Sequence, residues 1–239
     1  MQIELQNICK RFNNRRILDN LSLTVKSGER FVIMGRSGSG KTTLLRLIAG
    51  LDNPCSGTIR LGDVAVFGDG KFVEPHARGL SLIFQELALW PHLTVAQNCE
   101  VVLRRLERRK QERKRRVRDM LRDVQILEMA DEYPHTLSAG EKQRASLARA
   151  LITQPRILLL DEPLNYLDIH LKHEIMNLIL RTHEVRGITL VYVTHEPDEA
   201  LLLNASVGIL DGGNIVISGD AVGMIELFRS NKWKGERKG

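Results

Sequence analysis

The sequence lacks any long run of apolar residues. Of its 239 residues 43% are hydrophobic, but the longest apolar runs, such as 157–160 and 188–193, have only the length of a β-strand. A helix that spans a membrane needs roughly 18–20 predominantly apolar residues in succession. The first residues also lack the apolar region of a secretory signal. We therefore expect a cytoplasmic chain with one sizeable core, which reaches a membrane only through a partner.

Cysteine is also scarce. The three cysteines, Cys9, Cys55 and Cys99, are scattered, and the sequence contains no CxxC pair and no Cys/His spacing typical of metal ligands. We therefore expect reduced thiols and no structural metal site.

Lysine and arginine outnumber the acidic residues, which gives a formal net charge of +6. That charge permits a nucleotide, a nucleic acid or lipid head groups as an anionic partner, but it does not choose among them.

Segments with strand character and segments with helix character alternate over most of the chain. The patterns predict strands at 3–5, 21–25, 30–34, 57–61, 80–84, 156–160 and 188–194, and a hairpin over 206–218 that turns at 211–213. They predict helices over 41–49 and 200–203 and a helix around 171–179. Such alternation indicates an α/β core.

The middle of the chain differs in character. From 94 to about 127 the residues favour helix and show little strand signal, and a second helix is predicted from Ser138 to about Ile152. We therefore expect one domain over 1–239. Its parts are an α/β core (about 1–87 and 154–222), a helical subdomain (about 88–153) and a basic tail (230–239).

The most informative motif is a glycine-rich loop between a predicted strand and a predicted helix. It consists of Gly35, Arg36, Ser37, Gly38, Ser39, Gly40, Lys41, Thr42 and Thr43, and it matches GxxxxGK[ST]. Glycines let successive backbone N–H groups turn toward phosphate oxygens, and the following helix adds its positive end. We expect Lys41 to contact the β- and γ-phosphates and the Thr42 hydroxyl to bind Mg²⁺.

Two acids follow the apolar strand that ends at Leu160. Carboxyl ends of strands in this fold class lie beside the phosphate loop. We therefore expect Asp161 to hold Mg²⁺ and Glu162 to act as the general base for an attacking water. Solvated acids at a strand end are the alternative, which the phosphate loop makes less favourable.

A further set of motifs resembles the ABC ATPase family. The sequence LSAGE at 137–141 resembles the LSGGQ signature of that family. The other markers follow in family order: Gln85 resembles the Q-loop glutamine, Asp168 the end of the D-loop, and His195 the switch histidine. Phe12 lies where the family places an aromatic ring that stacks on adenine.

The resemblance implies a fold and a set of ligands. The implied fold is α/β, a phosphate-loop NTPase core with an N-terminal antiparallel β part and an α-helical subdomain. The implied ligands are ATP and Mg²⁺, with Thr42, Gln85 and Asp161 at the metal. Catalysis is implied for Lys41, Gln85, Glu162 and His195. In addition, Ser138-x-x-Glu141 is a capping box, which exposes a helix start suited to an anion.

Partners are implied as well. In the family, the signature residues, here Ser138 and Gly140, contact ATP bound to a second subunit, which is identical or a close paralogue. Integral permease subunits hold such pairs at the inner face of the membrane. The stretch 86–95 resembles that of importers of small solutes. The alternative is a soluble ABC ATPase that acts on nucleic acid or the ribosome, although the chain has neither a long coiled-coil insertion nor a second cassette.

Three residues depart from the family pattern. Ala139 replaces a signature glycine, Tyr166 is bulky where the family has a small D-loop residue, and Ala205 replaces an aspartate.

The stretch 104–118 holds ten Lys or Arg residues and two acids. It is a solvated face, a contact for anionic lipid, or a contact for nucleic-acid phosphates. We expect no specific nucleic-acid partner, since no aromatic residues interleave with its charges.

Overall fold

The computed structural model describes residues 1–13, 15–165 and 167–230. Tyr166 and the tail from residue 231 onward therefore lie outside the described residues. Among the residues described, no helix has both the length and the apolar character required to cross a membrane.

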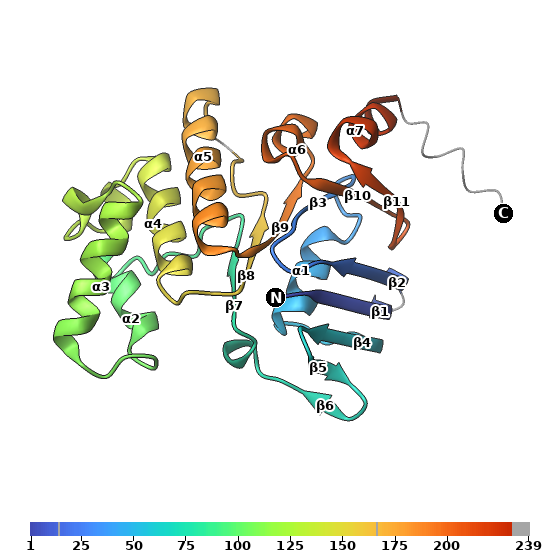
Figure 1. The fold of residues 1–239 in the computed structure, drawn as a ribbon, viewed down its shortest axis with the longest axis horizontal. Helices are drawn as coiled ribbons and strands as arrows, with labels where there is room; N and C mark the ends of the chain where they lie inside the picture. The colour runs from blue at the N-terminus through green and yellow to red at the C-terminus, as the bar shows by residue number, and fades with distance from the viewer. Residues whose placement is uncertain (14, 166, 231–239) are drawn as a thin grey trace.

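The strands form two sheets (Figure 1). A five-stranded sheet with antiparallel pairing runs in the order β2-β1-β4-β5-β6. Its strands are β1 (Ile3–Phe12), β2 (Arg15–Val25), β4 (Ser56–Leu61), β5 (Val64–Gly68) and β6 (Lys71–Phe72). A six-stranded sheet runs in the order β11-β10-β3-β9-β8-β7, and all its strands are parallel except β11. Its strands are β3 (Arg30–Met34), β7 (Leu80–Ile83), β8 (Ile157–Asp161), β9 (Thr189–Thr194), β10 (Ser206–Asp211) and β11 (Asn214–Asp220).

Helices cover both faces of the parallel sheet. They are α1 (Lys41–Ala49), α2 (Val95–Leu103), α3 (Lys110–Asp123), α4 (Ala139–Leu151), α5 (Ile169–Arg186), α6 (Pro197–Leu203) and α7 (Ala221–Ser230). Short 3₁₀ turns are η1 (Pro75–Ala77), η2 (Leu127–Met129) and η3 (Pro134–Thr136). In Figure 1, α1 lies between the two sheets, whereas α2, α3 and α4 gather at the opposite end of the molecule from β1, β2 and β4.

The parallel sheet separates two apolar clusters. Alternate residues of β3 belong to different clusters: Phe31 and Ile33 pack with α1 and the antiparallel sheet, whereas Val32 and Met34 pack with the other helices. This two-residue alternation follows from strand geometry. Because both faces are covered, β8 and β9 are buried along their whole length. The expected α/β fold class, with its antiparallel part and helical part, is confirmed.

Three differences from the sequence-based expectations concern single elements. The helix expected from 94 to about 127 is two helices, α2 and α3, joined by a turn over 104–109. The first two strands are longer than expected: β1 continues to Phe12, and β2 begins at Arg15. Strands β5 and β6 and helix α7 were not predicted. Helix propensity gave no signal for the break after Leu103, because the arginines and the glutamate that follow it favour helix themselves.

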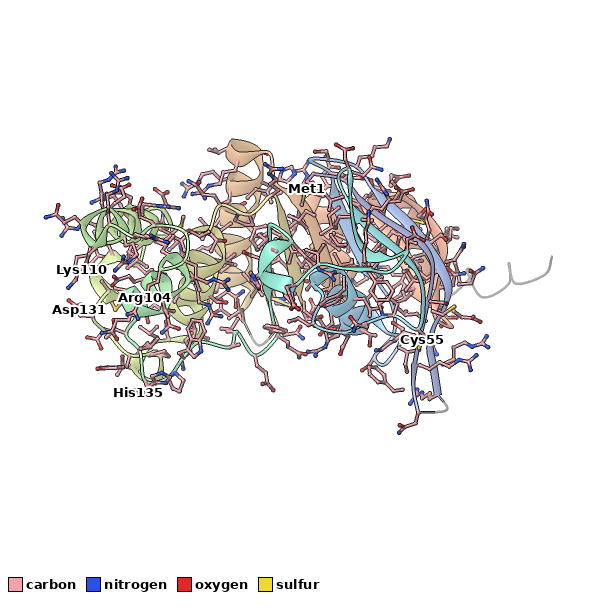
Figure 2. The ribbon with its side chains drawn as sticks, turned by 90° about the horizontal axis from the view of Figure 1, so that it is seen from below. Met1, Cys55, Arg104, Lys110, Asp131 and His135 are labelled. Carbon is pink, nitrogen blue, oxygen red and sulfur yellow. The ribbon has the colours of Figure 1, made fainter. Side chains whose placement is uncertain are left out.

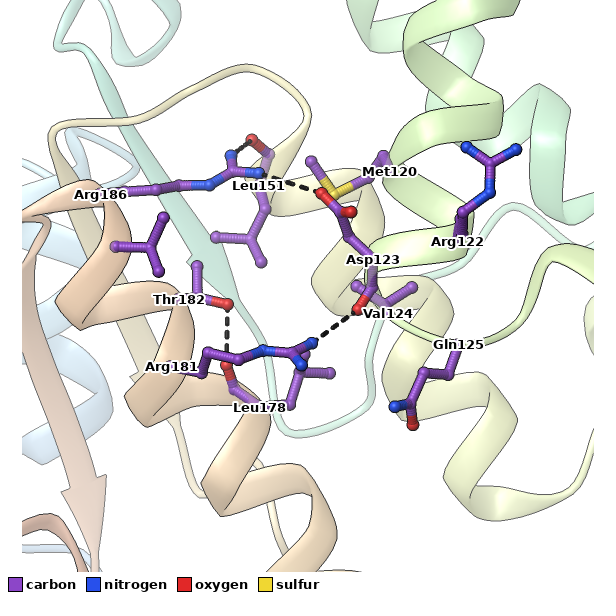
Figure 3. Close-up of a pocket in the computed structure, with 11 residues that line it drawn as sticks. Met120, Arg122, Asp123, Val124, Gln125, Leu151, Leu178, Arg181, Thr182 and Arg186 are labelled. Carbon is purple, nitrogen blue, oxygen red and sulfur yellow. Dashed lines mark hydrogen bonds and ion pairs between the residues drawn. The ribbon is translucent and has the colours of Figure 1, made fainter.

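The helical part is joined to α5 through the carboxyl ends of α3 and α4, around a cavity of about 370 Å³ (Figure 3). The Arg181 side chain donates a hydrogen bond of 3.0 Å to the backbone carbonyl of Asp123, and Arg186 donates one of 3.1 Å to that of Leu151. The last carbonyls of a helix have no partner within the helix, and cations are favourable there. The two arginines thus complete the ends of both helices.

Candidate functional site

The glycine-rich loop connects the end of β3 to the start of α1, at the centre of the parallel sheet. A Cβ atom on Gly35 would lie 2.5 Å from the carbonyl oxygen of Leu210, so no side chain fits there. Gly38 and Gly40 have positive φ angles of 75° and 106°. L-residues rarely adopt such angles. The loop therefore depends on glycine at three positions for its shape.

Lys41 is buried inside this loop, with 5% of the residue exposed. Its ammonium donates hydrogen bonds to the carbonyls of Gly35 (2.9 Å) and Arg36 (3.2 Å), and it lies 3.8 Å from a carboxylate oxygen of Glu162. Burial lowers the pKa of Lys41, and the nearby carboxylates of Glu162 and Asp161 partly oppose this shift. The site thus holds a desolvated cation, whose attraction for an anion is strong.

The loop and its surroundings fit a phosphate group and a magnesium ion. The Ser39 hydroxyl is buried and has no hydrogen-bond partner among the described residues. The Thr42 hydroxyl donates a hydrogen bond of 3.2 Å to Asp161. Oxygen ligands of this kind suit Mg²⁺, which takes only one or two protein groups alongside substrate phosphates. The described part of the chain contains no cluster of three or more His, Cys, Asp or Glu side chains able to hold a metal.

Asp161 is the last residue of β8 and is 4% exposed. Burial raises the pKa of its carboxyl, and the hydrogen bond from Thr42 partly counteracts this. An ionised carboxylate at this depth is costly unless a cation or further hydrogen bonds compensate for it. The position therefore favours a metal ion beside Asp161.

Glu162 follows in a left-handed conformation, with φ 46°. Its backbone N–H donates a hydrogen bond of 3.0 Å to Val193 of the neighbouring strand, which fixes the turn. One carboxylate oxygen accepts a hydrogen bond from the side-chain amide of Asn165 and lies 3.1 Å from Nδ1 of His195. The structure thus brings together Lys41, Glu162 and His195, which the sequence placed far apart.

Two supporting side chains near Glu162 and His195 were not identified from the sequence. Asn165 is one, and Glu199, 4% exposed, is the other. Glu199 accepts hydrogen bonds from the hydroxyls of Tyr192 (2.9 Å) and Thr194 (2.6 Å), and Thr194 accepts one from the Glu196 backbone N–H (2.9 Å). Both neighbours of His195 are therefore held. Glu199 lies in the first turn of α6, and nothing in the sequence indicates that this acid is buried.

Gln85 lies two residues beyond β7, whose Ile83 pairs with Leu160 of β8. It is exposed, and with Ala139 and Asn165 it lines a groove of about 470 Å³. Gln85 therefore shares one groove with the start of α4 and with Asn165, which donates a hydrogen bond to Glu162.

The segment after Gln85 is unusually constrained. Leu87 and Ala88 both have positive φ angles, 58° and 47°. Arg149 of α4 donates hydrogen bonds to both of their carbonyls and places its guanidinium 4.9 Å from the ring centre of Trp90. The fully buried Asn98 makes four hydrogen bonds to backbone groups of residues 90–94. The sequence did not single out Arg149 or Asn98.

The capping box at the start of α4 is confirmed. The Ser138 side chain accepts a hydrogen bond from the Glu141 backbone N–H (3.3 Å), and the Glu141 carboxylate accepts one from the Ser138 backbone N–H (2.8 Å). Ser138 and Ala139 are exposed, but Gly140 is buried, and a Cβ on it would lie 2.6 Å from the Leu171 side chain. The exposed part of this helix start is therefore Ser138 and Ala139.

Two more of the predicted residues lie at element ends. Asp168 is the N-cap of α5, and its carboxylate accepts a hydrogen bond of 3.0 Å from the Leu171 N–H. Phe12 ends β1, is 47% exposed, and has the Lys10 ammonium 4.8 Å from its ring centre. An exposed aromatic ring at a strand end is available for stacking.

Comparison with known proteins gives a consistent result. A family model described as ABC transporter matches residues 18–165. The spermidine/putrescine import ATP-binding protein PotA of Pseudomonas aeruginosa is 42% identical over 213 residues, which cover 89% of this chain and 58% of that protein. The protein of the same name in Thermotoga maritima is 41% identical over 218 residues, covering 90% of this chain and 57% of that protein. The chain thus spans less than two thirds of the length of these relatives.

Solved structures match as well. The dimeric structure of MJ0796, described as a bacterial ABC transporter cassette, has a TM-score of 0.81 and 31% identity, covering 92% of this chain and 98% of that chain. A structure of the same cassette in a post-hydrolysis state, bound to ADP and Pi, matches with the same TM-score and identity.

Proposed function

The chain belongs to the ABC transporter family, and from this and the geometry of the site we propose that it binds ATP and hydrolyses it to power a membrane transporter. The observation that carries the proposal is the buried Lys41 ammonium, held inside the phosphate loop 3.8 Å from the Glu162 carboxylate. A cation and a base at one loop are the two groups that phosphate binding and water activation require.

Each residue of the site takes a separate role in this proposal. Backbone N–H groups of residues 35–43 and the Lys41 ammonium bind the phosphates. Glu162 accepts a proton from water as the water oxygen bonds to the γ-phosphorus, and the bond from that phosphorus to the bridging oxygen of ADP breaks. Lys41 and His195 stabilise the negative charge that develops. Phe12 stacks on the adenine.

A magnesium ion completes the proposed site. Thr42, Asp161 and Gln85 are the residues that would hold it. When bound, Mg²⁺ neutralises phosphate charge. The hydroxyl and carboxylate already in contact, Thr42 and Asp161, support this assignment.

We further propose that two such subunits, identical or closely paralogous, act together. In this arrangement Ser138, Gly140 and Asp168 of one subunit complete the ATP site of the other. The dimeric form in which MJ0796 was solved supports this. The partners of the pair are permease subunits, which place the chain at the inner face of the membrane. The relatives named as spermidine/putrescine import proteins support import of a small solute and make a polyamine the first one to test.

Two variants test ATP hydrolysis and separate it from binding. Lys41→Ala removes the cation and should abolish tight ATP binding, whereas Lys71→Ala, at an exposed site on β6, should leave binding unchanged. Glu162→Gln should bind Mg²⁺-ATP normally while hydrolysis slows by roughly 10² or more, the scale for loss of a general base. Nucleotide affinity is measured by calorimetry and turnover by phosphate release.

Unchanged affinity in Lys41→Ala, or normal turnover in Glu162→Gln, would contradict the proposed roles. The transport role is tested by purification in mild detergent. Recovery of integral membrane proteins supports it, and recovery of ribosomes or DNA in their place favours the soluble alternative.

A further inference from the structure

The turn over 104–109 and helix α3 carry a strong positive charge at one end of the molecule. Figure 2 shows Arg104 and Lys110 at the end opposite to Cys55 of the antiparallel part. The stretch 104–118 contains ten Lys or Arg residues and two acids. The site described above uses none of them.

Some of these cations already have partners. Arg109 pairs with Glu107, Arg113 with Glu100 and Arg115 with Glu112, and Arg116 donates to the carbonyl of Ile152. The side chains of the remaining six make no hydrogen bond or ion pair within the described part of the chain, and all six residues are exposed: Arg104, Arg105, Arg108, Lys110, Lys114 and Arg118. The surface therefore presents a group of cations without counter-charges.

Three of the unpaired cations form a row on α3. Lys110, Lys114 and Arg118 are spaced by four residues, so neighbours in the row are about 6 Å apart along the axis. Like charges at this spacing destabilise a helix in water. The apolar residues that hold α3 to the core, among them Val117 and Leu121, are buried. Repulsion within the row therefore lowers the stability of α3, and contact with an anionic surface would offset that repulsion.

An exposed leucine lies among the cations of the turn. Leu106 is 60% exposed, next to Arg105 and two residues before Arg108. An apolar side chain surrounded by arginines is the composition of protein surfaces that enter the head-group region of a lipid bilayer. Contact with the phosphates of a nucleic acid would use the cations but not the leucine. Single-stranded nucleic acid is bound through stacking aromatic side chains, and the stretch 104–118 contains none.

We propose that the turn over 104–109 and the row Lys110, Lys114 and Arg118 together bind the head groups of anionic phospholipids. The cations contact lipid phosphates, and Leu106 enters the head-group layer. This contact would hold the chain at a membrane in addition to any permease subunit. It does not depend on ATP hydrolysis, so either proposal can fail without the other.

The test measures binding of the full chain to vesicles by co-sedimentation at an ionic strength of about 0.15 M. Vesicles of phosphatidylcholine are compared with vesicles of phosphatidylcholine and phosphatidylglycerol in equal parts. We expect binding only when phosphatidylglycerol is present. The triple variant Lys110→Gln, Lys114→Gln, Arg118→Gln should lower the partition coefficient about 100-fold, since each basic residue near such a surface contributes about fivefold.

A charge-matched control distinguishes this surface from the general positive charge of the chain. Arg15→Gln, Lys26→Gln, Lys71→Gln removes three exposed cations of the antiparallel part whose side chains make no hydrogen bond or ion pair with the described residues. It should lower the partition coefficient by less than about threefold. Glutamine favours helix, so α3 should persist in the first variant, which circular dichroism checks.

Three results would overturn the proposal. The first is an equal loss of vesicle binding in the two triple variants. The second is wild-type affinity in both the α3 triple variant and Leu106→Gln. The third is binding to a DNA duplex, under the same conditions, by a chain that does not bind the anionic vesicles.

Discussion

At the scale of single residues, Asp161 shows how a residue of the functional site can lower the stability of the folded chain. Its carboxyl is almost fully buried, and burial is the main cause of its raised pKa. The folded chain therefore binds a proton at Asp161 more tightly than the unfolded chain does. Stability consequently falls as the pH rises from the ordinary value of 3.8 through the raised pKa, and above that the cost is complete.

The variant Asp161→Asn should remove this cost. At neutral pH and without nucleotide, we expect its free energy of unfolding to exceed that of the wild type by about 1 kcal/mol, the usual gain when a functional site is neutralised. The difference should shrink as the pH falls toward 3.8. Urea denaturation at several pH values measures it, with Asp63→Asn at an exposed position as the control. A lower stability at neutral pH, or a gain that does not vary with pH, would contradict this account.

Some site residues could be predicted from the sequence because their chemistry is encoded locally. The glycines of the phosphate loop, Lys41 and the capping box of Ser138 each follow from a few adjacent residues. Asn165 and Glu199 could not be predicted, because their roles depend on contacts made only after strands β8 and β9 pair.

At the scale of elements, the turn between β9 and α6 is built around one buried carboxylate. Glu199 on α6 accepts hydrogen bonds from Tyr192 and Thr194 on β9, and His195 lies between Thr194 and the start of α6. Burial also raises the pKa of Tyr192 well above its ordinary value, with the Glu199 charge as a second cause. The tyrosine therefore remains a hydrogen-bond donor. We therefore expect Glu199 to act as a positioning residue for His195.

Glu199→Gln should change turnover more than binding. Both hydroxyls donate to one carboxylate oxygen, and the other oxygen lies 3.5 Å from the Lys172 ammonium. The neutral amide weakens the contacts with the hydroxyls and loses this ion pair, so the turn loosens, and misplacing His195 should lower kcat by on the order of tenfold to a hundredfold. ATP affinity should stay close to wild type. Tyr192→Phe, which removes one donor but leaves the Thr194 contact, is the control and should keep most of its activity. Equal loss of kcat in the two variants would show that the carboxylate serves only the fold.

Element boundaries were predictable where a strong local signal exists. Gly50 and Gly187, both with positive φ angles, end α1 and α5, and Ser138 starts α4. The turn after Leu103 has no such signal, because its arginines favour helix. On a straight helix Leu103 and Val117 would share a face but lie about 21 Å apart along the axis. The turn instead folds α3 back against α2, so that both residues are buried in one apolar cluster.

At the scale of the whole molecule, the proposed pairing of two subunits rests on the exposed start of α4. The sequence pointed to Gly140 as a contact, but its burial against Leu171 means that a side chain there would disturb the packing of α5. Ala139 is exposed and lines the groove with Gln85. It is therefore the better place to probe a partner.

Ala139→Asp should leave ATP binding to single subunits intact and prevent pairing. Its carboxylate would oppose the γ-phosphate of the partner's ATP, and like charges about 4 Å apart repel by roughly 1–4 kcal/mol. The change is made in the Glu162→Gln background, where bound ATP persists, and size-exclusion chromatography follows dimer formation. Ala139→Ser is the neutral control. An ATP-dependent dimer that forms equally well with Ala139→Asp would contradict the proposed arrangement.

The constrained backbone after Gln85 is connected to the protein surface through the side chain of Arg149. Left-handed angles at Leu87 and Ala88 cost on the order of 1 kcal/mol each, and the two hydrogen bonds from Arg149 offset this. The conformation of this segment therefore depends on Arg149, which holds the carbonyls of both residues. Trp90 stacks on the same arginine and is 38% exposed, so a partner could contact it at the surface. Trp90 is thereby linked, through Arg149, to the carbonyls of Leu87 and Ala88, two and three residues after Gln85.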